Sequence, residues 1–396
     1  MFADIKEALD YIENRRQKHT LDYFKSVLDH ENIDYLLPCI HVTGTNGKGG
    51  TINFISHILQ EANYKVGTFT SPYIVCHQDR FMINGKMMSN ELLLGYINKN
   101  LDIIEKYDLA MFEIDFIIML QYFKDQQVDI ALIEVGIGGR NDKTNMIMPM
   151  ASIITNVGHD HFAQIGPTLK DVAYEKAGII KDGVPCFIGD LSEDLVEVFK
   201  KEANLKHSKL SVVKVNNPYG DIAFELEMEG SYHLKNACMA IEVVKTVFPH
   251  LTKENIKSGL KKARWPGRFE KIEYHNATVY LDGAHNLDAI DVILESVSKM
   301  NFVEKPIFVY AALKDKDFQL MASKIREQYN LHVCKFSDGR SLSEQEISLL
   351  CGQVVYDSIE DALNCMKQED KVFVVCGSLH FISQFRNKIV QNTQVV

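Results

Sequence analysis

Short apolar runs alternate with longer stretches of helical periodicity along most of the chain. The runs that favour strands are 39–43, 66–70, 129–135, 152–157, 278–281, 306–311, 332–336 and 371–375. Many of them are apolar on both faces, as parallel strands between two helix layers must be. Between the runs, Ile52, Ile55 and Leu59 fall on one face of a helix. Ile290 and Ile293 do the same later in the chain. The alternation predicts α/β sheets that are mostly parallel, with right-handed crossovers.

The segment 264–268 interrupts this alternation and predicts a domain boundary. Its proline ends the preceding helix, and its glycine permits backbone angles that other residues avoid. A fresh series of strands and helices follows, about as long as one domain. We therefore expect two domains, residues 1–267 and 268–396. Before the boundary, 209–215 and 223–228 have the pattern of a small antiparallel excursion.

The composition is that of an ordinary globular protein. Of 396 residues, 46% are hydrophobic and 24% charged, which excludes a disordered chain, a collagen and a coiled-coil rod. No apolar run reaches the roughly 18 residues of a membrane helix, so we expect no membrane partner. Acidic residues outnumber basic ones, 53 to 43, and the formal net charge is −10. Because a negative field repels phosphate backbones, we expect no general binding of nucleic acid.

The eight cysteines are scattered, and no CxxC pair gives a zinc-finger spacing. The stretch 1–16 is amphipathic and acidic, without the apolar core or cleavage site of a signal peptide. We therefore expect a cytoplasmic protein whose reduced thiols pack as small hydrophobic groups.

The strongest chemical signal is the glycine-rich segment 41–51, between an apolar strand and an amphipathic helix. Glycines let the backbone wrap closely around phosphate oxygens, while Lys48 and the N–H groups of the helix start supply positive charge. The segment departs from the GxxxxGK[ST] pattern, because Gly49 follows the lysine. A plain strand-to-helix turn is the alternative. Since such a turn rarely needs a lysine between glycines, we favour phosphate binding.

Further polar residues follow other strands, at the edge where open α/β sheets bind ligands. The Ser71 hydroxyl could ligate Mg²⁺, although for this motif on its own a turn or helix cap is the favoured explanation. Glu134 ends a buried strand, so it needs a cation beside it, either Mg²⁺ or Arg140. The 159–161 segment, His-Asp-His, fits a metal ligand or a proton carrier, or a loop of surface histidines.

The second half carries similar signals. Asp282 could accept a hydrogen bond from a ribose hydroxyl, and His285 could handle a proton or a phosphate. A capped turn is the alternative, with Asn286 leading the next helix. Arg268 could reach phosphates or could lie along the surface, and Lys176 could simply end a solvated helix. Their common placement at strand ends predicts one small-molecule site between the domains.

Together these segments resemble the folylpolyglutamate synthase and dihydrofolate synthase family, within the Mur ligases. The motifs in family order are HVTGTNGKG, TSP, EVGIGGR, TNVGHDH, EKAGIIK, WPGRFE and LDGAHN. The resemblance runs from about Thr20 to the C-terminal sheet. It implies an N-terminal P-loop ATPase domain with a mostly parallel sheet and a smaller, Rossmann-like C-terminal α/β domain.

The activity implied is an ATP-dependent ligation of L-glutamate to a pterin carboxylate through an acyl phosphate. The partners implied are pteroate or folate, L-glutamate and ATP, and we expect a monomer. One alternative is a Mur-type ligase for cell-wall precursors, which the TSP motif disfavours. Another is a non-catalytic ATP-binding relative. A purely structural protein would leave the motifs at the strand ends without a purpose.

The resemblance also implies roles for individual residues. The phosphate loop is Gly44, Thr45, Asn46, Gly47, Lys48 and Gly49; the Mg²⁺ ligands are Ser71, Glu134 and His161; the nucleotide contacts are Asn236, Arg268 and Asp282; the pterin segments are Thr20, Leu21 and Asp22, and Asn141, Asp142 and Lys143. Lys48, His161, Lys176 and His285 form the implied catalytic set. Lys176 matches a lysine that relatives carry as a carbamate, and a monovalent cation is a further implied cofactor.

Two positions and one segment depart from the family pattern. Gly50 replaces a serine of the phosphate loop, whose hydroxyl Thr51 could supply by a local shift. Phe116 stands where a threonine is common near the substrate pocket, and the 141–143 segment differs from the commoner Leu-Asp-Ala. We expect the first departure to affect the phosphate loop and the others to affect pterin specificity.

Overall fold

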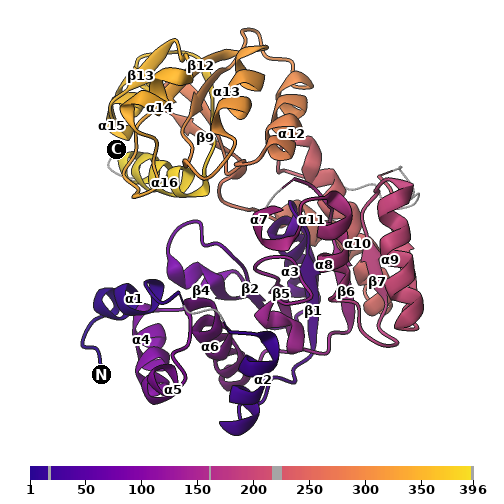
Figure 1. The fold of residues 1–396 in the computed structure, drawn as a ribbon. Coiled ribbons are helices and arrows are strands. Elements are labelled where there is room, and N and C mark those ends of the chain that lie inside the picture. Colours follow the sequence, from indigo (N-terminus) through magenta and orange to yellow (C-terminus); the bar gives the residue numbers. More distant parts are fainter. Residues whose placement is uncertain (17–18, 160–161, 216–224, 394–396) are drawn as a thin grey trace. The chain divides into compact units, whose positions relative to one another are not determined.

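A computed structural model describes residues 1–16, 19–159, 162–215 and 225–393. The chain divides into two compact units (Figure 1). Unit 1 consists of Met1–Glu225 and Lys235–Ala263, and unit 2 consists of Leu226–Leu234 and Arg264–Val396. Each unit is built around its own sheet, so the predicted α/β class with mostly parallel sheets is confirmed.

The sheet of unit 1 has the strand order β4-β3-β2-β5-β1-β6-β7-β8. Its strands are β1 (Cys39–Thr43), β2 (Val66–Phe69), β3 (Phe81–Ile83), β4 (Lys86–Met87), β5 (Ile130–Glu134), β6 (Ala151–Ile154), β7 (Cys186–Ile188) and β8 (Leu210–Val212). In this spatial order, the strands β2, β5, β1, β6, β7 and β8 pair in parallel. At the edge, β3 pairs antiparallel with β2, and β4 pairs antiparallel with β3. The carboxyl ends of β2, β5, β1 and β6 therefore meet along one edge of the sheet.

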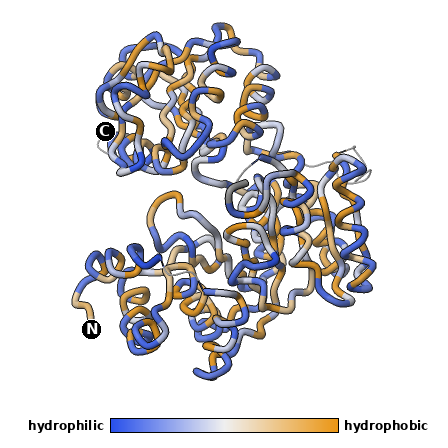
Figure 2. Tube along the Cα trace, in the orientation of Figure 1, coloured by the Kyte–Doolittle hydropathy of each residue, from blue (hydrophilic) through white to orange (hydrophobic). Residues whose placement is uncertain are grey.

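The helices of unit 1 pack on this sheet or on one another. They are α1 (Ile5–Glu13), α2 (Leu21–His30), α3 (Lys48–Glu61), α4 (Asn90–Lys99), α5 (Leu101–Lys106), α6 (Met111–Asp125), α7 (Phe162–Ile165), α8 (Leu169–Ala177), α9 (Glu193–Leu205) and α11 (Lys253–Lys262), with the 3₁₀ turns η1 (His77–Arg80) and η2 (Lys143–Met146). α10 (Ser231–Val247) begins in unit 2 and continues in unit 1. Figure 2 shows that hydrophobic and hydrophilic positions alternate along most helices, as partly covered helices require.

Helix α3 is more deeply buried than its single predicted apolar face implies. Ile52, Ile55 and Ile58 are fully buried, and so is Phe54. The reason is its close packing against α11 on one side and the strands on the other. A Cβ atom on Gly259 of α11 would lie 2.5 Å from the Ile58 Cα atom, so only glycine lets the two helices approach this closely.

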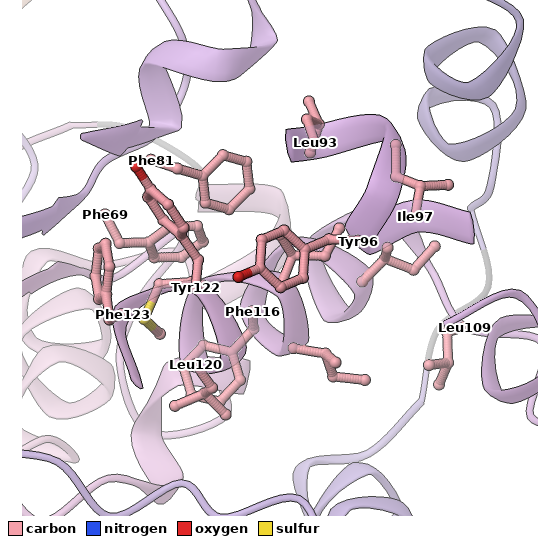
Figure 3. Packing of buried hydrophobic residues seen from close by; sticks show 14 of the residues in the cluster. Phe69, Phe81, Leu93, Tyr96, Ile97, Leu109, Phe116, Leu120, Tyr122 and Phe123 are labelled. Atoms are coloured by element: carbon pink, nitrogen blue, oxygen red, sulfur yellow. The ribbon is translucent and has the colours of Figure 1, made fainter. Parts of the chain in front are cut away.

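One large apolar cluster of unit 1 gathers around α6 (Figure 3). Phe116 is fully buried and meets Phe24 edge to face at 6.2 Å between ring centroids. Phe123 fills the space beside Gly67, where a Cβ atom would lie 2.9 Å from its ring. Phe116, expected near the substrate pocket, is thus a core residue.

The sheet of unit 2 has the order β13-β12-β11-β14-β10-β9 and is parallel except for β9. Its elements are β9 (Arg268–Tyr274), β10 (Ala277–Asp282), α12 (Leu287–Ser298), β11 (Ile307–Tyr310), α13 (Phe318–Arg326), β12 (Asn330–Cys334), α14 (Glu344–Leu349), β13 (Val354–Tyr356), α15 (Ile359–Met366), β14 (Val372–Cys376) and α16 (Leu379–Thr393). On α12, Ile290 and Ile293 are buried as the periodicity predicts.

One expectation about the fold is wrong. Residues 209–215 do not begin an antiparallel excursion, because β8 pairs in parallel with β7. The second part of the expected excursion lies partly outside the described residues, and 225–228 forms no strand. A three-residue strand is too short to show the direction of its pairing in the sequence. No helix within the described ranges has the length and apolar character to cross a membrane.

Candidate active site

The phosphate loop joins β1 to α3 and is held by the segment after β6. Gly47 begins the helix with a φ of 82°, in the left-handed region that favours glycine. The backbone N–H of Asn46 donates to the side chain of Asn156 at 2.8 Å. The backbone N–H of Gly158 donates to the Thr45 hydroxyl at 2.9 Å. These bonds fix the loop before any ligand arrives.

Gly44 tolerates no side chain. A Cβ atom there would lie 1.8 Å from the Thr155 hydroxyl oxygen, which itself donates to the Asn46 carbonyl at 2.5 Å. We expect Gly44→Ala to weaken the binding of an ATP analogue by about tenfold or more, because the phosphate loop must shift. Isothermal titration calorimetry measures this change. Gly95→Ala is the matched control, because Gly95 lies in α4 with open space around it.

A control that weakened ATP binding as much as Gly44→Ala would contradict this prediction. We expect Gly95→Ala to bind the analogue normally and to raise stability slightly, by about 0.5–1 kcal/mol, since alanine favours a helix interior.

Lys48, at the start of α3, lies close to Glu134, at the end of β5. The Lys48 ammonium donates to the Gly44 carbonyl at 3.1 Å, and its nitrogen lies 3.7 Å from a Glu134 carboxylate oxygen. Their side chains are only 16% and 5% exposed. The backbone N–H of Ser71 approaches the other Glu134 oxygen at 3.4 Å. A cation, a carboxylate and the Ser71 loop therefore converge on the phosphate loop.

Arg140 is not the partner of Glu134, which was one of the two predicted possibilities. Its guanidinium donates to Glu202 at 2.9 Å and lies over the Tyr174 ring, 4.1 Å from the centroid. The Arg140 backbone N–H also donates to the Glu175 carbonyl at 2.8 Å. Arg140 therefore anchors the turn after β5 to the end of α8.

Lys176 lies on that same end of α8 and is 3% exposed. The alternative of a solvated lysine at a helix end is therefore wrong. Burial of an ammonium group is costly unless hydrogen bonds or an ion pair compensate it.

The donors beside the phosphate loop suit Mg²⁺. This ion prefers oxygen ligands and is usually held by one or two carboxylates together with substrate phosphates. Glu134 provides a carboxylate and Ser71 a hydroxyl next to the loop. Among the residues that the structure describes, no three His, Cys, Asp or Glu side chains form a metal cluster by themselves. His161, the third implied ligand, lies outside those residues, and His159 is exposed.

Asn236, the implied nucleotide contact on α10, packs against the phosphate loop. A Cβ atom on Gly47 would lie 2.6 Å from its amide oxygen, and one on Gly50 would lie 2.5 Å from its amide nitrogen. Gly50 therefore leaves room for this amide where a serine would crowd it. The Thr51 hydroxyl is buried and has no hydrogen-bond partner among the described residues, so it can still form a hydrogen bond.

The two predicted pterin segments are brought together beside α6. The Lys143 ammonium donates to the backbone carbonyl of His19, next to the Thr20 segment. It also lies 3.6 Å from the carboxylate of Glu113 on α6, which contacts the His19 ring at 2.9 Å. The start of α2 and the turn η2 thus form one region, although more than a hundred residues separate them.

Several side chains of these segments are occupied by local bonds. The Thr20 hydroxyl caps α2, and the buried Asp142 carboxylate accepts the Thr144 N–H at 2.9 Å and the Ile137 N–H at 3.1 Å. Burial raises the pKa of Asp142. Asn141 is exposed, and its amide nitrogen donates to the Glu175 carboxylate at 3.2 Å. Leu21 is half-buried and Asp22 is exposed. The Thr20 and Asp142 side chains are therefore used in local hydrogen bonds that hold the backbone of this region.

In unit 2, Asp282 is buried within a network of protein donors. Its carboxylate accepts the Tyr232 hydroxyl at 2.6 Å and the backbone N–H groups of Phe269 and Ala284, each at 2.9 Å. Burial raises the pKa of Asp282, while the charge of Arg268 acts in the opposite direction. Asp282 thus ties the turn after β10 to the start of β9 and of α10.

The ends of β10 and β14 lie side by side in this sheet. His285, half-buried, contacts the Gly283 carbonyl through Nδ1 at 2.7 Å. The Gly377 N–H donates to the Ala284 carbonyl at 2.9 Å. Beside it, the Ser378 hydroxyl is buried and has no hydrogen-bond partner among the described residues. The sequence prediction missed Ser378. A Gly-Ser pair directly after an apolar strand is a signal for the carboxyl edge of the sheet, where Asp282 and His285 also lie. Asn286 caps α12 as predicted.

Comparison with known proteins gives consistent matches. The Mur ligase middle domain matches residues 42–188, and the Mur ligase, glutamate ligase domain matches residues 267–379. A dihydrofolate synthase/folylpolyglutamate synthase of Bacillus subtilis is 34% identical over 88% of this chain and 90% of its own. A folylpolyglutamate synthase of Lacticaseibacillus casei is 32% identical over 96% of this chain and 99% of its own. A solved folylpolyglutamate synthase–AMPPCP complex has a TM-score of 0.83 and 29% identity, and covers 98% of this chain and 100% of that chain.

Proposed function

The chain belongs to the folylpolyglutamate synthase and dihydrofolate synthase family of Mur ligases, and we propose that it joins L-glutamate to the carboxylate of a reduced pterin or folate. It is an ATP-dependent ligase. The observation that carries the proposal is the convergence of Lys48, Glu134 and the Ser71 loop on a rigid glycine-rich turn. This arrangement neutralises and aligns phosphates.

The reaction must first make a carboxylate reactive. An acceptor carboxylate oxygen attacks the γ-phosphorus of ATP, the bond to the β-phosphate oxygen breaks, and ADP leaves. The acyl phosphate then meets the L-glutamate amine, whose nitrogen attacks the carbonyl carbon. A C–N bond forms, the C–O bond to the phosphate breaks and phosphate leaves with its electron pair, and the nitrogen loses a proton. Anions that repel each other meet in both steps, so positioning and charge compensation supply most of the catalysis.

The residues of this chain supply that compensation. Lys48 would place its ammonium beside the β- and γ-phosphates, near the N–H groups at the start of α3, and Asn236 packs against the loop. Glu134 and Ser71 would hold Mg²⁺, with His161 as the third implied ligand. When bound, this ion would neutralise charge on the phosphates. A carbamate on Lys176 would turn a buried cation into an oxygen donor.

The substrate segments of unit 1 and three residues of unit 2 carry the remaining proposed roles. Thr20 to Asp22 and Asn141 to Lys143 form the acceptor region beside α6. In unit 2, Arg268, Asp282 and His285 are the proposed contacts for the nucleotide and for the transferred groups. The functional division into 1–267 and 268–396, a monomeric state and a cytoplasmic location stay predictions from the sequence, as does the monovalent cation.

Comparing acceptors tests this function. We expect ADP release that requires both L-glutamate and either dihydropteroate or a tetrahydrofolate, with labelled glutamate incorporated into the acceptor. Rates with the two acceptors distinguish addition of the first glutamate from extension of a glutamate tail. A UDP-sugar cell-wall precursor is the control acceptor. Turnover with that precursor alone would favour a cell-wall ligase, and ATP binding without turnover on any acceptor would favour a non-catalytic relative.

A further inference from the structure

A buried ion-pair cluster surrounds His77, in the loop between β2 and β3. The His77 ring contacts a Glu13 carboxylate oxygen through Nδ1 at 2.8 Å and an Asp115 carboxylate oxygen through Nε2 at 2.9 Å. The side chains of His77 and Asp115 are 1% and 0% exposed, and that of Glu13 is 33% exposed. No residue of this cluster was singled out by sequence motifs, and the proposed mechanism uses none of them.

The geometry makes His77 a cation. A carboxylate can only accept, so each ring nitrogen that faces one must donate, and both nitrogens carry a proton only in the imidazolium. Burial by itself would lower the pKa of His77, but the charge of Asp115 and the bonds to Asp115 and Glu13 overcome it and raise the pKa to about 9. The other charged or titratable groups around the ring are Arg80, Asp79 and Tyr73.

His77 joins three segments, each of which leads to a residue of the proposed site. Glu13 ends α1, seven residues before Thr20 in the sequence. Asp115 lies two residues after Glu113 on α6, and Glu113 contacts the acceptor segments. The loop that carries His77 begins at Ser71.

Hydrogen bonds within the loop hold it together, so a shift of His77 would also move Ser71. The Thr70 N–H donates to the Arg80 carbonyl at 3.1 Å and closes the loop at its base. The Asp79 carboxylate accepts the N–H groups of Ile74 and Val75 at 2.8 and 2.6 Å. Because these bonds leave the loop little internal freedom, its attachment to α1 and α6 through His77 sets its position as one piece.

We propose that His77 is a positioning residue, an imidazolium held between Glu13 and Asp115 that places the Ser71 loop against the phosphate loop and the acceptor segments. This inference rests on the proposed function, because it assigns His77 to the Mg²⁺–ATP and acceptor sites of that reaction. His77 touches neither reactant; it acts through the loop.

The test measures equilibrium binding of AMPPCP with Mg²⁺, which needs no acceptor and no turnover. His77→Phe keeps a ring of similar size and removes both ion pairs. We expect its half-saturating Mg²⁺ concentration to rise about tenfold, since a displacement of the loop misplaces Ser71. Glu13→Gln keeps an acceptor oxygen and removes one charge at a partly exposed position, so it folds readily. We expect a smaller rise of about threefold.

The pH dependence separates positioning from general stability. The folded pKa lies above the ordinary value of 6.5, so the contribution of His77 is complete below about 6.5 and is lost as pH rises through about 9. The half-saturating Mg²⁺ concentration of the unmodified chain should therefore rise between pH 8 and 10. That of His77→Phe should stay flat over the same range.

His332→Phe is the matched control, because His332 is also buried and bonded, to the Tyr356 hydroxyl at 2.8 Å, but lies in unit 2. We expect it to lower the melting temperature and leave Mg²⁺ dependence unchanged. If His77→Phe and Glu13→Gln lowered the melting temperature only, with normal Mg²⁺ dependence at every pH, the positioning role would be wrong. Failure of the acceptor assay with normal Mg²⁺–AMPPCP binding would instead overturn the proposed function.

Discussion

Replacing Lys48 by alanine is expected to reduce the rate of ADP formation by about a thousandfold or more, the largest effect of any single substitution proposed for this chain. The ammonium lies at the start of α3, bonded to the Gly44 carbonyl, so it is preorganised for phosphate before substrate binds. Removal of a fixed cation from a partly dry site loses charge compensation where negative charge gathers.

The same substitution should also lower stability. The Glu134 carboxylate is 5% exposed and would lose the cation 3.7 Å away, at a cost of about 3 kcal/mol. The rate is measured by coupled ADP detection and the stability by urea unfolding. Lys170→Ala is the matched control, because Lys170 is a surface lysine of the same unit, 63% exposed and 3.7 Å from Asp194. Full activity in Lys48→Ala would refute the phosphate role of this loop.

Substituting asparagine for Asp282 is expected to destabilise unit 2 by about 3 kcal/mol and to lower its melting temperature by roughly 10 °C. The carboxylate accepts three donors, from Tyr232, Phe269 and Ala284. An amide offers a single acceptor oxygen, and its NH₂ group would face a donor. Differential scanning calorimetry of the whole chain measures the change.

Asp291→Asn controls for the loss of a carboxylate from the same unit. Asp291 is 52% exposed and pairs with Lys324 at the surface, so its removal should cost less than about 1 kcal/mol. If Asp282→Asn unfolded like the unmodified chain but bound ATP more weakly, the nucleotide-contact role implied by the family resemblance would explain Asp282 better than its structural bonds do.

These two residues differ in how far local sequence could reveal their roles. Lys48 was predicted because its function depends on neighbours in the chain: a strand, glycines and a helix start within a few residues. Asp282 was predicted from its place after a strand. Its principal bonds, however, reach Tyr232, fifty residues earlier, and Phe269, thirteen residues earlier. The sequence does not reveal whether a carboxylate at a strand end will accept hydrogen bonds from a ligand or from the protein.

The sequence by itself determined the α/β class, most long strands, the glycine-rich turn between β1 and α3, and the family. Apolar runs, glycine turns and helix periodicity are local consequences of backbone sterics and burial, so they are legible along the chain. Only the tertiary structure decided that Arg140 pairs with Glu202, that Phe116 belongs to the core and that Lys176 is buried.

The His77 cluster shows the physical reason most clearly. Its partners Glu13 and Asp115 are 64 and 38 residues away, on two different helices. The charge of a histidine and the cost of burying a carboxylate depend on which groups the fold brings within about 3 Å. That information is absent from any short stretch of sequence and arises only when the packed elements fix the distances.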